Sequence, residues 1–266
     1  MTGQVTPLMV VVLLTLLSLA VIFLERRWIR LRYLTLLVSL AFFGFYNATG
    51  LAGSGWFQDI VLKLRHFREF VLYYAIILGM IGFTAVFGQV FCGWVCPMGA
   101  VQEFLHNFHQ KHPKIPEKLD FWLSKVKYIF AIFLIGYSIV VGAKIHYINP
   151  FYVVFNLDSP SIYLLIFAGA LLLLSTFVYR PWCRWFCPFS AVFNILGRFS
   201  PFKIRPTYPQ CVNCRLCERA CRLNAIKTIK KPDGGKETIV DQSRCIRCGD
   251  CIAVCPKDAI FLDAGG

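Results

Sequence analysis

Eight of the twelve cysteines in this 266-residue chain stand in two closely spaced runs near its C-terminus. Both runs read C-x2-C-x2-C-x3-C, and the second is followed directly by Pro256. Two-residue gaps let a tight loop direct three thiolates at one iron–sulfur cube, whereas the fourth cysteine of each run ligates the other cube. A zinc ribbon would use two C-x2-C pairs instead. The spacing therefore predicts two [4Fe–4S] clusters with crossed ligand sets, which are Cys211, Cys214, Cys217 and Cys255 for the first and Cys245, Cys248, Cys251 and Cys221 for the second.

The composition changes at the start of this tail. Residues 202–266 carry 12 of the 28 Lys+Arg and no apolar run long enough to cross a membrane. We therefore expect residues 201–266 to form a small α+β two-cluster ferredoxin-like domain. An oxidised [4Fe–4S] cluster with four thiolate ligands carries a net charge of about −2. Nearby cations could raise its potential or could dock the domain on anionic lipid headgroups; both readings apply to Arg215, Arg219, Arg222, Arg244, Arg247 and Lys257.

The rest of the chain is too apolar for a soluble protein. Hydrophobic residues make up 57% of the sequence and charged residues 16%, against roughly 25% charged in soluble domains. This balance argues against a soluble enzyme and against a disordered chain. Apolar runs of about 20 residues match the ~30 Å of a hydrocarbon core. We expect residues 1–200 to be an α-helical polytopic membrane domain of about five helices, at Leu8–Leu24, Tyr33–Gly50, Phe70–Phe91, Tyr128–Ile145 and Ser161–Tyr179.

Basic residues in the connections predict the orientation. With five spans, the first connection, the third connection and the tail share one side, and all three are rich in Lys and Arg. This places the ferredoxin domain in the cytoplasm and the N-terminus outside a multi-pass cell inner (plasma) membrane protein. Lys63, Arg65 and Arg68 fall on the outer side against this trend. They lie in a stretch, Phe57 to Phe67, that is either an amphipathic interfacial helix or a simple packing helix.

The remaining four cysteines form a duplicated motif. The ten residues that begin at Cys92 and the ten that begin at Cys183 agree at six positions, 91 residues apart, and each copy reads C-x3-C-P. Cysteines at i and i+4 share a helix face, and proline disfavours helix in the residue before it. Two such helices related by a pseudo-two-fold axis would bring four thiols together. They could hold a third Fe–S cluster or a soft metal such as Cu(I) or Zn, or be small buried side chains; the residues are Cys92, Cys96, Cys183 and Cys187.

These motifs together resemble the NapH/MauN-type membrane ferredoxin proteins. The resemblance covers roughly Tyr33–Phe261, including the turn at Ile148-Asn149-Pro150. Arg222 departs from the pattern, because it stands where the second run has Pro256. The family is usually drawn with four spans, so the first span here would be an addition. The resemblance implies electron transfer at the cytoplasmic membrane face, often between the quinone pool and a partner reductase.

Other cofactors have little support in the sequence. No apolar run carries a histidine in its interior, so we expect no haem. Nor is there a flavin-attachment domain or a glycine-rich nucleotide fingerprint. The histidines at 106, 109 and 112 could ligate metal or relay protons, but we expect a solvated helix face. The positive charge lies near clusters and lipid, so no nucleic-acid partner is expected.

We read the chain as a membrane-anchored iron–sulfur electron-transfer subunit of a respiratory or redox complex, rather than a stand-alone enzyme. It would relay electrons between a quinone or membrane partner and a redox partner at the cytoplasmic face. Its partners would be the lipid bilayer, other subunits of the complex and, as a candidate, quinone. The alternative is an assembly or maturation factor whose membrane thiols handle copper or another cofactor.

Overall fold

The computed structural model describes residues 13–18, 31–46, 71–108, 115–141, 162–230 and 236–264. The chain forms two compact units, which are described separately below. The first combines Met1–Thr35, Gly79–Val95 and Phe193–Gly266, and the second combines Leu36–Leu78 and Cys96–Val192. The C-terminal tail thus shares a unit with two earlier segments. The domain boundary after residue 200 stays a prediction drawn from composition.

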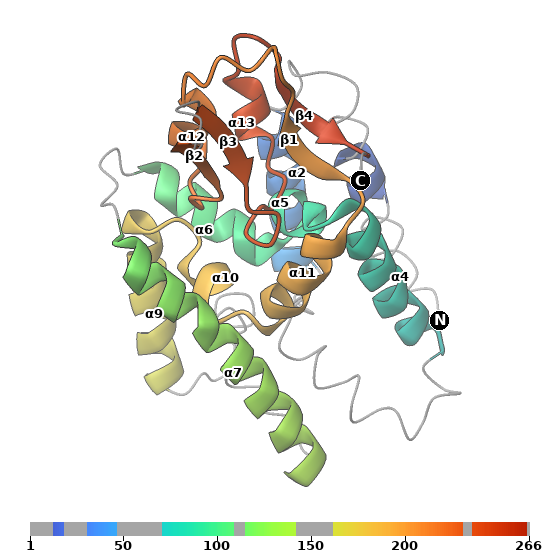
Figure 1. Cartoon of the computed structure of the whole chain (residues 1–266). Coiled ribbons are helices and arrows are strands. Elements are labelled where there is room, and N and C mark those ends of the chain that lie inside the picture. Colours follow the sequence, from blue (N-terminus) through green and yellow to red (C-terminus); the bar gives the residue numbers. More distant parts are fainter. Residues whose placement is uncertain are drawn as a thin grey trace. The chain divides into compact units, whose positions relative to one another are not determined.

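The sequence repeat corresponds to a repeat of helices. A long helix, a five-residue helix and a twelve-residue helix follow one another twice, and each helix begins 91 residues after its counterpart. The first set is α4 (Val71–Phe87), α5 (Val90–Trp94) and α6 (Pro97–Phe108); the second is α9 (Ile162–Phe177), α10 (Pro181–Trp185) and α11 (Pro188–Phe199) (Figure 1). The residues that end α5 and α10, Val95 and Phe186, have nearly the same φ and ψ.

Each C-x3-C-P motif occupies the junction between two short helices. The first cysteine lies inside α5 or α10, and the second follows the helix end. The carbonyl of Cys96 accepts from the Ala100 amide, and that of Cys187 from the Ala191 amide. The second cysteine therefore caps the helix that its proline begins, since proline is favoured at the first helical position.

Helix boundaries differ from the apolar runs in two places. The run at Phe70–Phe91 is not one helix, because Gly88 adopts a φ of +71° after α4 ends at Phe87. The helix expected from Tyr128 begins earlier, since α7 covers Glu117–Val141. A hydropathy scan finds only the apolar part of a helix, and the first turns of α7 are too polar to be included. Of the run at Tyr33–Gly50, the described part up to Tyr46 is helical and forms α2 (Leu31–Ser39) and the π-helical η2 (Leu40–Tyr46).

Among the described residues, one helix is long and apolar enough to cross a membrane, Lys118–Val141 within α7. Three apolar helices are shorter, Leu31–Gly44, Leu78–Phe87 and Ile162–Phe177. Only residues 13–18 of the expected first span are described. The expected amphipathic stretch from Phe57 to Phe67 and the turn at Ile148–Pro150 lie outside the described residues.

The second unit has a core between its helices. Along α9, buried residues recur at one-turn spacing, and this face contacts α6. Met98, Leu171 and Trp182 form the centre of the core, and three cysteines pack against it. The opposite face of α9 is apolar and exposed, as Tyr163 and Leu173 show. In α7, Ile132 and Val140 are also exposed.

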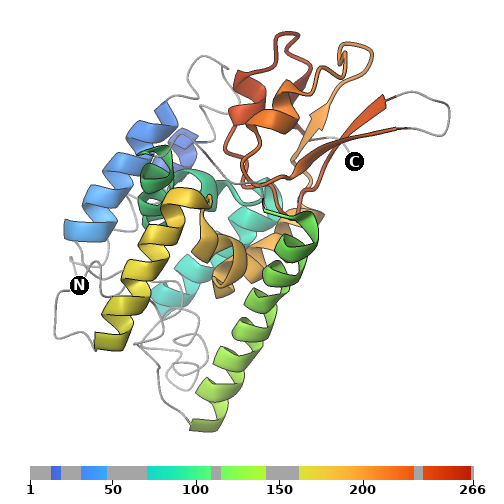
Figure 2. The same ribbon diagram turned by 90° about the vertical axis from the view of Figure 1, so that its left-hand side faces the viewer.

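The C-terminal tail in the first unit is an α+β fold with an internal repeat (Figures 1 and 2). Strand β1 (Lys203–Pro206) pairs antiparallel with β4 (Ile260–Asp263), and β2 (Ile226–Lys230) pairs antiparallel with β3 (Lys236–Val240). Two short helices, α12 (Leu216–Ala220) and α13 (Asp250–Ala253), lie side by side and carry the middle of each cysteine run. Ile204, Ile226 and Ile260 fill the core between these elements.

Candidate metal centres

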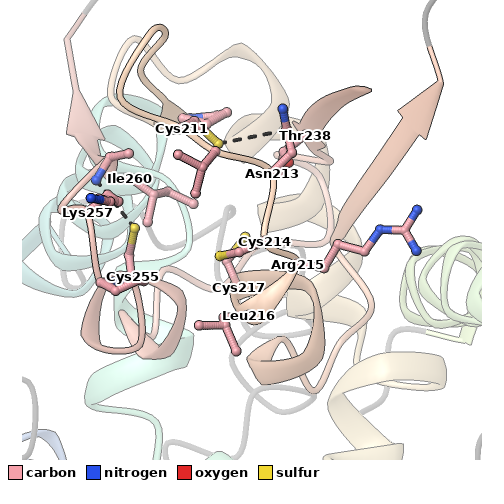
Figure 3. A pocket seen from close by; sticks show the side chains of 14 residues that line it. Cys211, Asn213, Cys214, Arg215, Leu216, Cys217, Thr238, Cys255, Lys257 and Ile260 are labelled. Atoms are coloured by element: carbon pink, nitrogen blue, oxygen red, sulfur yellow. Dashed lines mark hydrogen bonds between the residues drawn. The ribbon is translucent and has the colours of Figure 1, made fainter. Parts of the chain in front are cut away.

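Four of the tail cysteines line one pocket. Cys211, Cys214 and Cys217 come from the first run, and Cys255 is the last cysteine of the second. Figure 3 shows their sulfur atoms directed at a shared space. Cys214 is exposed, whereas the other three are partly buried. The structure therefore gathers the four residues that the spacing assigned to the first cluster.

Backbone in the left-handed region shapes the loops of both cysteine runs. Asn213 and Arg247 both have φ near +54°, and they occupy equivalent places in the two runs. A second equivalent pair, Arg215 and Gly249, also lies in the left-handed region and precedes α12 and α13. Non-glycine residues seldom adopt this conformation, and it clusters at ligand-binding sites.

Backbone amides serve the last cysteine of each run. The Ala225 amide donates to Cys221 Sγ at 3.3 Å, and the Ala259 amide donates to Cys255 Sγ at the same distance. Hydrogen bonds to cluster sulfurs raise the potential of an iron–sulfur centre, because they stabilise negative charge on sulfur. Both fourth cysteines are thus prepared in the same way to act as thiolate ligands.

The other four tail cysteines lie around the core of the same fold. Cys251 is buried and interacts electrostatically with Cys248, Cys245 and Cys221. Burial raises the pKa of Cys245 to about 11 and raises the pKa values of Cys248 and Cys251 as well. At neutral pH these thiols are therefore protonated, and metal binding would have to displace their protons.

Among the described residues, no group of three His, Cys, Asp or Glu side chains is placed to hold a single metal ion. In a [4Fe–4S] cluster each thiolate binds a different iron, so the sulfurs surround a volume rather than a point.

In the first unit, the loop of the second cysteine run packs against the first C-x3-C-P motif. Trp94 Nε1 donates to the Arg247 carbonyl at 3.0 Å, and Gln89 Nε2 donates to the Ser243 carbonyl at 2.7 Å. A Cβ on Gly93 would lie 2.3 Å from the Ile246 carbonyl oxygen. Cys92, which precedes Gly93, is therefore held in a segment that contacts the loop of Cys245 and Cys248.

This close approach makes a prediction about Gly93. Gly93→Ala should force α5 and the loop apart, because the added methyl would meet backbone rather than a flexible side chain. We expect a loss of about 1–3 kcal/mol in the free energy of unfolding, as for other overpacked sites. Chemical denaturation measures it. Gly136→Ala is the matched control, since nothing lies within 4 Å of its Cβ position, and it should be neutral or slightly stabilising. Equal effects of both substitutions would contradict the contact.

In the second unit, three of the four C-x3-C-P cysteines come together. Cys96, Cys183 and Cys187 all pack against the core at Met98 and Trp182. Cys183 interacts electrostatically with both of the others. Cys92 belongs to the first unit, so its convergence with these three stays a prediction.

Two of these thiols lie at helix N-termini. The amides of Met98 and Gly99 donate to Cys96 at the start of α6. Likewise, amides from Phe189 and Ser190 donate to Cys187 at the start of α11; burial nevertheless raises the pKa of Cys187 to about 11. A helix N-terminus stabilises an anion, which favours thiolate ligation once a metal is bound.

Buried polar side chains hold the third thiol. Gln102 Nε2 donates to Cys183 Sγ at 3.3 Å, while its Oε1 accepts from the Trp182 amide. The neighbouring Glu103 is fully buried and accepts from Arg180 Nη2 at 2.6 Å and from Tyr179 Oη at 2.9 Å. On the other side of α10, Arg184 and Trp185 both donate to Asp120 on α7.

Sequence reasoning missed these polar side chains. The available signal was a carboxamide and a carboxylate inside an otherwise apolar segment, which usually marks a functional or paired group. The solvated face expected around His106 is wrong, because His106 is buried and meets the Tyr179 ring edge-on at 5.4 Å. It shares the inward face of α6 with Gln102 and Glu103. His109 and His112 lie outside the described residues.

Two protein-family models match separate segments of this chain. The 4Fe-4S binding domain family matches residues 70–116 and again residues 161–207, which are the two helix–motif–helix copies. The 4Fe-4S dicluster domain family matches residues 210–259. The chain belongs to the NapH/MauN-type ferredoxin proteins. Both family models that match it describe domains that bind 4Fe-4S clusters.

Relatives differ in how much of their length is matched. An uncharacterised protein of Methanocaldococcus jannaschii is 33% identical over 66% of this chain and 73% of its own length. Escherichia coli YccM, whose name provisionally assigns it to electron transport, is 29% identical over 68% of this chain but 52% of itself. The ferredoxin-type protein NapH of Haemophilus influenzae is 25% identical over 87% of this chain and 86% of its own length. The chain thus spans about half the length of YccM. No solved structure matches.

Proposed function

We propose that the chain is a membrane-anchored iron–sulfur electron carrier within a larger redox complex. The observation that carries the proposal is the pocket lined by Cys211, Cys214, Cys217 and Cys255, because it joins cysteines from two separate runs in the crossed pattern of a two-cluster ferredoxin. These four would hold the first [4Fe–4S] cluster. Cys221, Cys245, Cys248 and Cys251, whose thiols interact electrostatically, would hold the second.

The residues present fit two such groups. Each proposed set supplies four thiols, and each contains one sulfur that accepts a backbone amide, Cys221 or Cys255. When bound, the clusters supply one-electron transfer without proton chemistry. The protein would shield the clusters from bulk water and leave one of them accessible to a redox partner. Cys214 is the exposed cysteine, so the first site is the one that a redox partner could approach.

The duplicated motif would supply a third site. Cys96, Cys183 and Cys187 already lie together in the second unit, with amides or a carboxamide donating to each sulfur. With Cys92 they would bind a third Fe–S cluster or another soft metal, between the tail clusters and a quinone or membrane partner.

Apolar, exposed helix faces support a place in the lipid bilayer. Ile132 and Val140 on α7 and Tyr163 and Leu173 on α9 would otherwise face water. We propose a multi-pass protein of the cell inner membrane, with the tail in the cytoplasm and the N-terminus outside. Anionic headgroups would then contact the basic connections.

Replacement of the duplicated cysteines separates this function from the rival maturation role. The double variant Cys183→Ser, Cys187→Ser should retain about eight irons per chain, because the tail sites are intact. In membranes that hold a preassembled complex, we expect steady-state electron flux from quinol to fall by at least about tenfold.

The control in the same experiment is synthesis of the partner enzyme. Normal flux through complexes that already exist, with loss of newly made partner enzyme only, would favour a maturation factor that handles copper or another cofactor. Unchanged flux together with unchanged partner synthesis would remove the four motif cysteines from both functions.

A further inference from the structure

Arg247 differs from the other basic residues near the clusters. It stands between Cys245 and Cys248, and its side chain is 0% exposed. By contrast, Arg219 lies between Cys217 and Cys221 on α12 and is exposed. Each arginine thus lies within two residues of two proposed ligands along the chain. Their surroundings differ, however, because water screens one charge and not the other.

The guanidinium of Arg247 is enclosed by backbone from the helical part of the first unit. Its Nη2 donates to the Phe202 carbonyl at 2.8 Å and to the Gly197 carbonyl at 3.4 Å. Gly88 leaves room for it, because a Cβ there would lie 1.5 Å from Nη1. Gly88 also has a φ of +71°, so this position excludes other residues on two grounds.

No carboxylate among the described residues forms an ion pair with Arg247. Within the described part of the chain, its Nε and Nη1 have no hydrogen-bond partner, although both atoms are buried. Asp250, the only acidic residue between Cys245 and Cys251 in the sequence, pairs with the buried Arg32 at 3.5 Å. An unpaired buried cation is strongly unfavourable, so a negative charge is missing from its surroundings.

We infer that Arg247 is the built-in counter-cation of the second cluster, and that it locks the cluster loop onto the segment Gly88–Trp94. An iron–sulfur cube with four thiolates carries about −2 charges and would lie beside this guanidinium. Arg247 already interacts electrostatically with the Cys245 thiol. The inference rests on the proposed ligand set for the second cluster.

The inference has two consequences. First, the unscreened positive charge favours the reduced form, so it raises the reduction potential of the second cluster relative to the exposed first cluster. Second, loss of that cluster would leave the cation uncompensated and loosen the contact between the loop and α5. Arg247 is thus a positioning residue. It couples the presence of the second cluster to the contact between the cluster loop and α5.

An EPR-monitored redox titration of the full chain in detergent tests the first consequence. In Arg247→Gln, the reduced-to-oxidised ratio of the second cluster at a fixed potential should fall about tenfold, which corresponds to about 59 mV for one electron. Arg247→Lys keeps the charge and should shift the ratio by less than about threefold, and so should the control Arg219→Gln. The signal that disappears in Cys251→Ser identifies the second cluster.

Iron content separates failure of the inference from failure of the proposed function. Fewer than about eight irons in the wild-type chain would overturn the two-cluster assignment itself. With about eight irons present, equal shifts in Arg247→Gln and Arg219→Gln would overturn the role of Arg247 alone.

If Arg247→Gln does not assemble, hydrogen exchange on the wild-type chain decides. Removal of iron by a chelator should then speed exchange of the amides in Gly88–Trp94. Unchanged exchange in this segment would overturn the coupling.

Discussion

Cys251→Ser is expected to remove about half of the iron and to loosen the first unit, whereas Cys214→Ser should remove about half of the iron only. Each substitution deletes one ligand of one proposed cube, so about four of the eight tail irons should remain. The difference lies in what surrounds the lost cluster. Cys251 is buried among the thiols of the second site, and one of these thiols, that of Cys245, interacts electrostatically with Arg247.

Loss of the second cluster should therefore lower stability more. An uncompensated buried charge costs about 3–5 kcal/mol, and each kcal/mol shifts the unfolding temperature of a chain this size by roughly 2–4 °C. We expect Cys251→Ser to unfold roughly 6–20 °C below Cys214→Ser, as measured by thermal unfolding with iron content determined in parallel. Equal unfolding temperatures with equal iron would contradict the coupling of cluster and fold.

Glu103→Ala should be among the most damaging substitutions in the second unit. Glu103 is fully buried, and its carboxylate accepts hydrogen bonds from Arg180 and Tyr179. Its removal leaves the buried Arg180 without that partner, which costs about 3–5 kcal/mol in the free energy of unfolding. Chemical denaturation in detergent measures the change.

Two further variants test whether loss of the buried ion pair causes the destabilisation by Glu103→Ala. Glu218→Ala breaks a half-exposed pair with Arg215 at 4.0 Å, and it should cost less than about 1 kcal/mol. Glu103→Gln keeps an acceptor and removes only the charge, so its effect should lie between those two. If Glu103→Ala were as mild as Glu218→Ala, the buried network would not stabilise the helices that carry Cys96 and Cys183.

Features that depend on local residue spacing were predictable from the sequence. The 91-residue cysteine repeat predicts the two copies of helix, motif and helix, and the spacing in the tail predicts which cysteines gather in the pocket of Figure 3. Both follow from local rules of ligand spacing and helix geometry. Apolar runs located the long helices but not the break at Gly88, since hydropathy carries no information on backbone dihedrals.

Long-range partners of charged residues could not be predicted. From the sequence alone, four arginines are indistinguishable basic residues near a membrane: Arg32, Arg180, Arg184 and Arg247. In the structure all four are buried; three pair with carboxylates, whereas Arg247 pairs with none among the residues that the structure describes. The partners Asp120 and Glu103 lie more than 60 residues away in sequence from the arginines they bind. Only the tertiary structure distinguishes a charge on a surface from one buried beside a cluster.

The central claim is that eight tail cysteines hold two cubes. The most direct test is iron and acid-labile sulfide per chain on the purified full chain, with Mössbauer spectroscopy to identify the clusters. The account predicts at least about eight irons, all in [4Fe–4S] form, and about twelve if the four motif cysteines hold a third cube. A preparation that retains fewer than about eight irons when assembled anaerobically, or one that binds zinc in their place, would contradict it.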